Sequence, residues 1–172
     1  MTTYEFTFIL DREPTDAEVE ALFEPFDGAA VPEFGNGTGV VHVHYLAESL
    51  AGAISESLVK VESVGLAVIG VESEDAVSIK DIADRVGRSY ESVRLLALGR
   101  RGPGGFPAAV GTGQWALYSW AEVSAWMQTH GIEHAEVADD YDRELAAADH
   151  LIRPRHLLHR DERADMARLA TA

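Results

Sequence analysis

The stretch of sequence that decides the fold is Ser78-Ile-Lys-Asp-Ile-Ala-Asp-Arg-Val-Gly-Arg-Ser-Tyr-Glu-Ser-Val-Arg-Leu-Leu-Ala-Leu-Gly99. Its apolar positions have the three- and four-residue spacing of two amphipathic helices, with one seam formed by Ile82, Val86, Val93 and Leu96. Ala83 is small, so the second helix can pass close over the first. Gly87 stands where a tight turn benefits from a positive φ. The stretch therefore predicts two short helices that cross around a tight turn.

The flanking residues extend this prediction in both directions. Ser78 and Ser89 are suitable N-caps, because a serine hydroxyl accepts a hydrogen bond from a backbone N–H of the first helical turn. The glycine- and proline-rich run after the second helix, over residues 100–118, predicts a small β-hairpin, or wing. Ser119-Trp-Ala-Glu122 is a capping box that begins a third helix. The large aromatic residues are expected in the core of this small domain: Phe106, Trp115, Trp120 and Trp126.

The order of helix, turn, helix, Gly-Phe-Pro wing and Tyr-x-Trp-x-Glu-Val-x-x-Trp helix resembles a known family. Residues 78–130 are similar to the MerR-like winged helix-turn-helix family, which includes phage excisionases and AlpA-type regulators. The resemblance covers about 50 of the 172 residues. It implies a DNA-binding transcriptional regulator or an excisionase-like architectural protein, with the second helix in the major groove and the wing on the backbone or in the minor groove.

The candidate DNA-binding residues are the solvent-facing ones of this segment. On the second helix, Tyr90, Glu91 and Arg94 project outward; Arg94 is expected to pair with guanine edges and Glu91 to accept from cytosine. Phosphate contacts are expected from the remaining candidates: Lys80, Arg88, Ser89, Arg100 and Arg101. Arg85 is left out of this set because it can equally pair with nearby aspartates on its own helix.

Residues 1–74 predict a separate domain. The strand Tyr4–Leu10 alternates apolar and polar residues. A capping box at Thr15 begins a helix that is expected to stop at Pro25. Two strands around a Gly-Asn-Gly turn, a helix over residues 50–64 and a last strand over residues 66–71 follow. The order is that of a ferredoxin-like βαββαβ domain, so the expected fold class is α+β.

Composition divides the rest of the chain into two further parts. The winged helix-turn-helix domain is placed at residues 77–131, and residues 132–172 are expected to form a C-terminal segment with a helix over 133–150, a break at Pro154 and a second helix over 156–170. The net charge of −15 is distributed unevenly: residues 78–131 carry six basic and four acidic side chains, whereas residues 1–77 carry two basic and fifteen acidic ones. Acidic flanks disfavour indiscriminate phosphate binding and favour a specific, dimeric reader of DNA.

Composition also excludes several classes of function. The chain has no cysteine, which rules out disulfides, thiolate metal sites and thiol nucleophiles. No phosphate-binding glycine loop or nucleophile elbow is present, so we expect no enzyme and no cofactor. His42 and His44 share one strand face, and a solvated or packed pair is favoured over a metal site. We expect a cytoplasmic protein without a membrane segment. The alternative function is a protein-interaction adaptor or antitoxin-type module, whose acidic N-terminal domain binds a basic partner.

Overall fold

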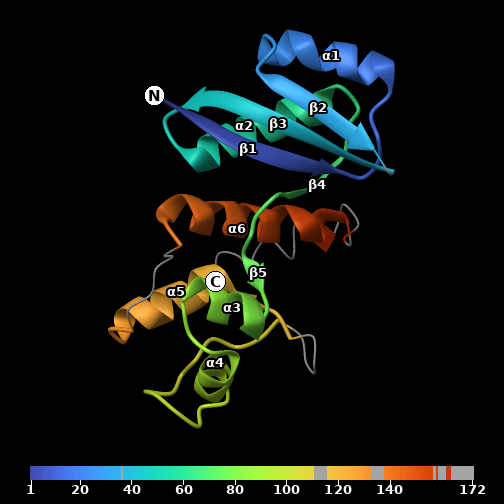
Figure 1. Ribbon diagram of the computed structural model, residues 1–172. Helices are drawn as coiled ribbons and strands as arrows, with labels where there is room; N and C mark the ends of the chain where they lie inside the picture. The colour runs from blue at the N-terminus through green and yellow to red at the C-terminus, as the bar shows by residue number, and fades with distance from the viewer. Residues whose placement is uncertain (36, 111–115, 133–137, 157, 159–161, 164–172) are drawn as a thin grey trace. The chain divides into compact units, whose positions relative to one another are not determined.

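The structure is a computed structural model that describes residues 1–35, 37–110, 116–132, 138–156, 158, 162 and 163 (Figure 1). It belongs to the α+β class, as expected, and contains antiparallel sheets and α-helices. The chain divides into two compact units. Unit 1 consists of residues 1–72 together with 147–172, and unit 2 consists of residues 73–146. The residues that the sequence grouped as one C-terminal segment are therefore shared between the two units.

Unit 1 begins with the expected order of strand, helix, strand, strand, helix and strand. These elements are β1 (Thr2–Leu10), α1 (Asp16–Phe26), β2 (Ala30–Gly35), β3 (Thr38–Ala47), α2 (Leu50–Ser63) and β4 (Val68–Val71). The strands form one antiparallel sheet in the order β2-β3-β1-β4, which leaves β2 and β4 at its edges. The prediction of these six elements is confirmed, and their boundaries differ from the predicted ones by at most two residues.

The alternation in β1 places its apolar side chains in the core of unit 1. Phe6, Phe8 and Leu10 are buried, whereas Thr7 and Ile9 between them are half-buried and the preceding Glu5 is exposed. The helices contribute the opposite side of this core through Leu22, Phe26, Leu50, Ile54 and Val61. Phe26 of α1 and Tyr45 of β3 meet edge to face, with ring centroids 6.3 Å apart. One face of the sheet is therefore covered by helices, as the alternation requires.

Helix α1 starts as predicted but ends later than predicted. The Thr15 hydroxyl accepts from Glu18 N, and the Glu18 carboxylate accepts from the Thr15 backbone N–H at 2.8 Å. The expected stop at Pro25 is wrong, because the helix continues to Phe26. A proline in the last turn removes only one backbone hydrogen bond, and the left-handed residue that follows, Asp27, closes the helix.

Helix α2 carries one buried polar atom without a partner. Ser57 is fully buried, and within the described part of the chain its hydroxyl makes no hydrogen bond. An unpaired buried hydroxyl costs free energy. We therefore expect Ser57→Ala to raise the free energy of unfolding by about 1 kcal/mol. Urea denaturation, with circular dichroism as the signal, measures this difference. Ser63→Ala is the matched control, since the Ser63 hydroxyl donates to the Lys60 carbonyl at 2.7 Å. Equal stability of the Ser57 variant and wild type would contradict the prediction.

The second part of unit 1 comes from the end of the chain. Helix α6 (Asp140–Ile152) is followed by a 3-10 turn, η1 (Arg153–His156), which contains the predicted helix breaker Pro154. The residues from Ala147 onward belong to unit 1. Residues 133–137, where this helix was expected to begin, and most of the second expected helix lie outside the described residues.

Asp149 joins this returning segment to the sheet. Its carboxylate is buried, accepts the backbone N–H of Val71 at 2.9 Å and pairs with Arg153 at 2.5 Å. A side chain at Gly70 would leave no room for this contact, because a Cβ atom there would lie 2.6 Å from Asp149 Oδ1. Unit 1 is therefore completed at β4 by residues 78 positions further along the chain.

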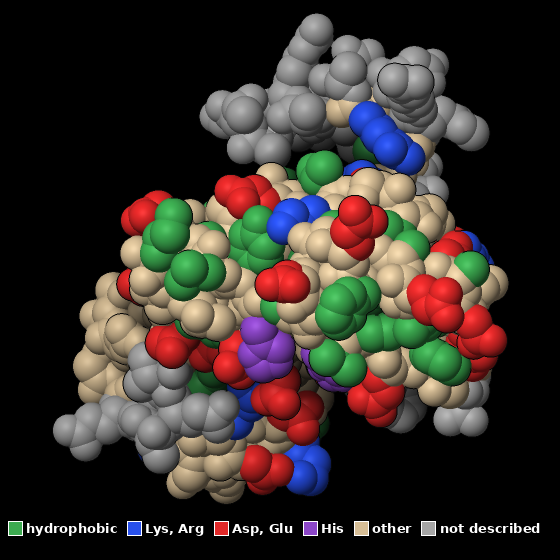
Figure 2. All heavy atoms as spheres, turned by 90° about the horizontal axis from the view of Figure 1, so that it is seen from above, with side chains coloured by type: hydrophobic (Ala, Val, Ile, Leu, Met, Phe, Trp, Pro, Cys, Tyr) green, Lys and Arg blue, Asp and Glu red, His purple; other side chains and the backbone are tan. Residues whose placement is uncertain are grey.

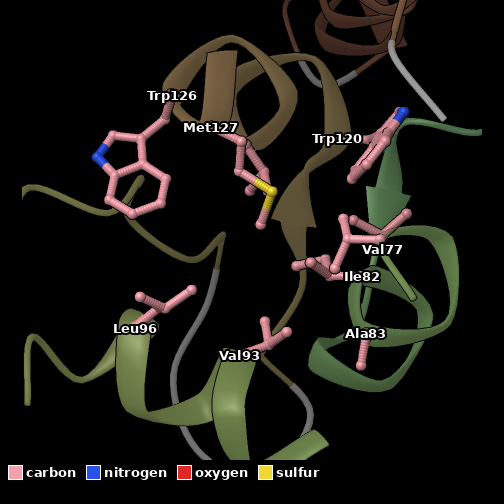
Figure 3. Packing of buried hydrophobic residues seen from close by; sticks show 10 residues of the cluster. Val77, Ile82, Ala83, Val93, Leu96, Trp120, Trp126 and Met127 are labelled. Atoms are coloured by element: carbon pink, nitrogen blue, oxygen red, sulfur yellow. The ribbon is translucent and has the colours of Figure 1, made fainter. Parts of the chain in front are cut away.

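Unit 2 contains the remaining elements. They are β5 (Ala76–Val77), α3 (Ile79–Arg85), α4 (Tyr90–Ala97), β6 (Tyr118–Ser119) and α5 (Trp120–Thr129). Strands β5 and β6 pair in antiparallel fashion, with Val77 opposite Tyr118. The three helices surround one apolar cluster, and this cluster decides which face of α4 is left to solvent (Figure 3).

Candidate nucleic-acid interface

The two helices of the quoted stretch form where the sequence predicted them. Ser78 caps α3, and Ser89 caps α4 by accepting from Ser92 N. Between the helices Gly87 has a φ of 62°, in the left-handed region that favours glycine. The next residue, Arg88, donates its backbone N–H to the Ala83 carbonyl at 3.0 Å, which closes the turn. The predicted caps and the predicted role of Gly87 are confirmed.

One face of α4 is occupied by the core of unit 2. Val93 and Leu96 are buried and point toward Met127 of α5, as does Ile82 of α3 (Figure 3). The predicted seam is thus confirmed, and it extends to residues of β5 and α5: Val77, Trp120, Val123, Trp126 and Met127. Because the buried face is fixed by this packing, the opposite face of α4 is held toward solvent.

The solvent face of α4 carries Tyr90, Glu91 and Arg94. Tyr90 is 54% exposed. The guanidinium of Arg94 donates to both oxygens of Glu91, from Nε at 2.8 Å and from Nη2 at 2.9 Å. This hydrogen bond lowers the pKa of Glu91 and raises that of Arg94. Arg94 therefore lies on the expected face, but as one half of a closed ion pair.

Lys80 of α3 is also engaged. Its ammonium donates to Asp84, one turn along the same helix, at 2.5 Å, and this hydrogen bond raises the pKa of Lys80. An exposed pair of this kind is worth a few tenths of a kcal/mol, typically about 0.3–0.5. Lys80 can exchange Asp84 for a phosphate at little cost, but its charge is balanced until then.

Arg88, Arg100 and Arg101 are exposed, and among the described residues none of them forms an ion pair. Arg88 precedes the N-cap of α4. Arg100 and Arg101 follow its end, and both donate their backbone N–H to the Leu95 carbonyl, at 2.9 and 3.2 Å. The eight residues of α4 make it about 12 Å long. Its two ends are thus the places where positive charge is least compensated.

Arg85 has a structural role. It pairs with Glu74 at 3.3 Å, lies 5.2 Å from the ring centre of Trp120, and its side chain is only 18% exposed. Leaving it out of the candidate set agrees with this geometry.

The base of the predicted wing is held by aromatic contacts. Trp126 Nε1 donates to the Gly104 carbonyl at 3.1 Å, and Phe106 packs between Trp126 and Tyr118 with ring centroids 5.0 and 5.7 Å away. Val110 and Leu117 form an isolated antiparallel bridge. Residues 111–115, including Trp115, lie outside the described residues. Trp120 and Trp126 are buried, which confirms that they belong to the core.

Helix α5 has a cap that sequence reasoning predicted only in part. The Ser119 hydroxyl accepts from Glu122 N, as predicted. The carboxylate at this helix start comes from Asp75, which accepts from Ala121 N at 2.8 Å and from the Ser119 hydroxyl at 3.1 Å. Asp75 lies 44 residues before Ser119, so no local motif could have indicated it.

Two histidines of unit 1, His42 and His44, are engaged in polar pairs. His42 contacts Thr7 and Glu33, both at 3.1 Å, and His44 contacts Glu5 at 3.2 Å. Within the described ranges, no group of three or more metal-ligating side chains is found. The interpretation of His42 and His44 as an ordinary surface pair fits these contacts.

Comparisons with known proteins do not add a relative. No protein-family model, no curated protein and no solved structure matches this chain. Among the described residues, no helix has the length and apolar character needed to cross a membrane. What the chain does must therefore be argued from its own residues.

Proposed function

We propose that unit 2 is a winged helix-turn-helix domain that binds double-stranded DNA, and that the protein is a transcriptional regulator or an excisionase-like architectural protein. This proposal rests on the packing and exposure of α4 and on the arginines at its ends. The inner face of α4 is fixed by the core, its outer face is exposed to solvent, and at both of its ends stand exposed arginines that form no ion pair with the residues that the structure describes. In the same proposal, unit 1 is a ferredoxin-like domain, supported by its strand order β2-β3-β1-β4.

The dimensions of α4 suit the major groove. The diameter of an α-helix with its side chains, about 10–12 Å, matches the groove width of about 12 Å. A helix in this position directs Tyr90 and Arg94 to base edges. Arg88 at one end, with Arg100 and Arg101 at the other, then lies near the two phosphate backbones that border the groove. Lys80 and Ser89 add contacts on the side of α3 and at the cap of α4.

A homodimer supplies the affinity that one copy lacks. One unit 2 brings the exposed Arg88, Arg100 and Arg101 to DNA, and each neutralised phosphate changes the slope of log K against log salt by about 0.9. Two copies on adjacent half-sites double this contribution. Sedimentation of the protein with its DNA site should therefore give two protein chains per duplex, and a single chain per duplex would contradict the homodimer.

The test begins with selection of bound duplexes from a random-sequence pool. Arg101→Ala is expected to weaken binding to the selected and to a shuffled duplex equally, and to lower the salt slope by about 0.9. Arg94→Ala is expected to remove about 1–3 kcal/mol of preference for the selected duplex, a loss of roughly 5- to 150-fold. Both are measured by fluorescence anisotropy at two salt concentrations.

The matched control for these variants is Arg143→Ala. Arg143 is an exposed arginine of unit 2 that pairs with Asp140 on α6, outside the candidate interface. Arg143→Ala changes the net charge by the same amount as Arg94→Ala or Arg101→Ala. Because Arg143 lies outside the candidate interface, its removal should leave the sequence preference unchanged. Wild-type binding constants in both interface variants would rule out this interface.

The acidic surface of unit 1 supports a second function, binding of a basic protein. Figure 2 looks onto the α1 side of the molecule, where acidic side chains are scattered among hydrophobic ones and basic side chains are few. Within unit 1, residues 1–72 carry thirteen acidic side chains against Arg12 and Lys60, whereas residues 147–172 carry four acidic and five basic ones. Recovery of the protein from native cells separates the two functions: a stoichiometric basic partner that survives nuclease treatment favours the adaptor, and loss of all partners on nuclease treatment favours DNA binding.

A further inference from the structure

The closed ion pair on the outer face of α4 has a defined hydrogen-bond geometry. An arginine side chain has five N–H groups, arranged along a side edge formed by Nε and Nη2 and an end edge formed by Nη1 and Nη2. In this protein the side edge of Arg94 is occupied by Glu91, at 2.8 and 2.9 Å. Three N–H groups remain, and the end edge is complete. This end edge can still donate two parallel hydrogen bonds.

The remaining edge suits a base better than a phosphate. Guanine presents O6 and N7 side by side in the major groove and accepts two parallel hydrogen bonds from one guanidinium. A phosphate is bound mainly through charge, and the charge of Arg94 is balanced by Glu91 at contact distance. Glu91 is 59% exposed in its side chain, and its hydrogen-bond partner in the described part of the chain is Arg94. The pair thus favours a guanine contact and disfavours a phosphate contact by the same residue.

We propose that Glu91 is a specificity-determining positioning residue, which fixes Arg94 for a guanine edge and suppresses its attraction to phosphate. The ligand is a duplex with a guanine opposite Arg94 in each half-site. This inference rests on the proposed function. It replaces the expectation that Glu91 accepts a hydrogen bond from cytosine. Both oxygens of Glu91 accept from the Arg94 side chain, so Glu91 acts through Arg94.

The test compares Glu91→Ala and Glu91→Gln with wild type on the selected and the shuffled duplex. In Glu91→Ala, the released Arg94 can move to a phosphate, so binding to the shuffled duplex should rise and the salt slope should steepen by about 0.9. The ratio of the two binding constants should fall about tenfold. Glu91→Gln loses the charge but keeps one acceptor, and its ratio should lie between those of wild type and Glu91→Ala.

A second measurement reports on the guanine directly. Replacing the guanine by 7-deazaguanine removes N7 and should cost wild type about tenfold in affinity, whereas Glu91→Ala should lose less than threefold. Asp84→Ala is the matched control, because it releases Lys80 from a similar exposed pair on α3. It should raise affinity for both duplexes and leave their ratio unchanged. Tryptophan fluorescence verifies that unit 2 of each variant is folded.

The outcomes separate this inference from the function on which it rests. A wild-type protein that binds neither duplex overturns DNA binding, and the inference with it. A wild-type protein that prefers the selected duplex, together with a Glu91→Ala variant of equal preference and equal 7-deazaguanine sensitivity, overturns the role of Glu91 alone.

Discussion

Replacing Trp126 by alanine is expected to destabilise unit 2 by about 3–5 kcal/mol, the usual cost of removing a buried tryptophan. Trp126 is 9% exposed, meets Phe106 edge to face, packs against the tilted ring of His130, and donates a hydrogen bond to the Gly104 carbonyl. A small domain has a total stability of about 5–15 kcal/mol, so this change removes a large share of the stability of unit 2 and should raise its unfolding constant by about two to four orders of magnitude. The loop at the base of the wing then loses its anchor, and DNA binding should be lost with it.

The chain permits a selective measurement of this effect. All three tryptophans, at positions 115, 120 and 126, belong to unit 2. Tryptophan fluorescence during urea unfolding therefore reports on unit 2, while circular dichroism reports on both units. Trp126→Phe is the control: it keeps an aromatic ring but loses the hydrogen bond to Gly104, and it should cost about 1–2 kcal/mol. If Trp126→Ala unfolds at the same urea concentration as wild type, the loop is held by other contacts.

The second large effect is expected in unit 1. Asp149→Ala leaves the Val71 N–H and the Arg153 guanidinium without their acceptor, and an orphaned buried donor with a lost charge-assisted hydrogen bond costs about 2–3 kcal/mol. Hydrogen exchange of the Val71 amide should accelerate, because the residues from Ala147 onward lose their attachment to β4. Exchange at the Val93 amide in unit 2 serves as an internal reference and should stay unchanged.

Two further variants, Asp149→Asn and Gly70→Ala, test whether the effect of Asp149→Ala comes from the lost contact with Val71. Asp149→Asn keeps an oxygen for the Val71 N–H and loses only the charge, so it should cost less than Asp149→Ala. Gly70→Ala leaves Asp149 intact but places a Cβ where its carboxylate lies, so it should accelerate exchange at Val71 as well. If the Val71 amide exchanges as slowly in Asp149→Ala and Gly70→Ala as in wild type, the residues from Ala147 onward do not stabilise the sheet.

Local signals in the sequence predicted most of the elements. The caps at Thr15, Ser78 and Ser89 were predictable because a cap is a bond between residues three positions apart. The pairs Glu91–Arg94 and Lys80–Asp84 lie three and four positions apart on their helices, so the spacing of opposite charges in the sequence could also have indicated them.

Long-range contacts were not predictable from such signals. Asp75 supplies the carboxylate at the start of α5 from 44 residues away, and Asp149 reaches β4 from 78 residues away. Asp75 closely follows Glu72 and Glu74, and Asp149 lies on a helix that also carries Asp140, Asp142 and Glu144. No local signal therefore distinguishes these two carboxylates from solvated ones. Only the packed structure shows which acidic side chains are buried.

The contact of Asp149 also affects how the sheet meets other molecules. An edge strand exposes backbone N–H groups on which a foreign strand can pair, and such pairing leads to aggregation. On β4, one of these groups is already bound by Asp149. On the opposite edge, Pro32 of β2 has no N–H to offer. Each edge of the sheet of unit 1 thus has one backbone position that cannot donate to an added strand. Loss of Asp149 would restore such a donor on β4.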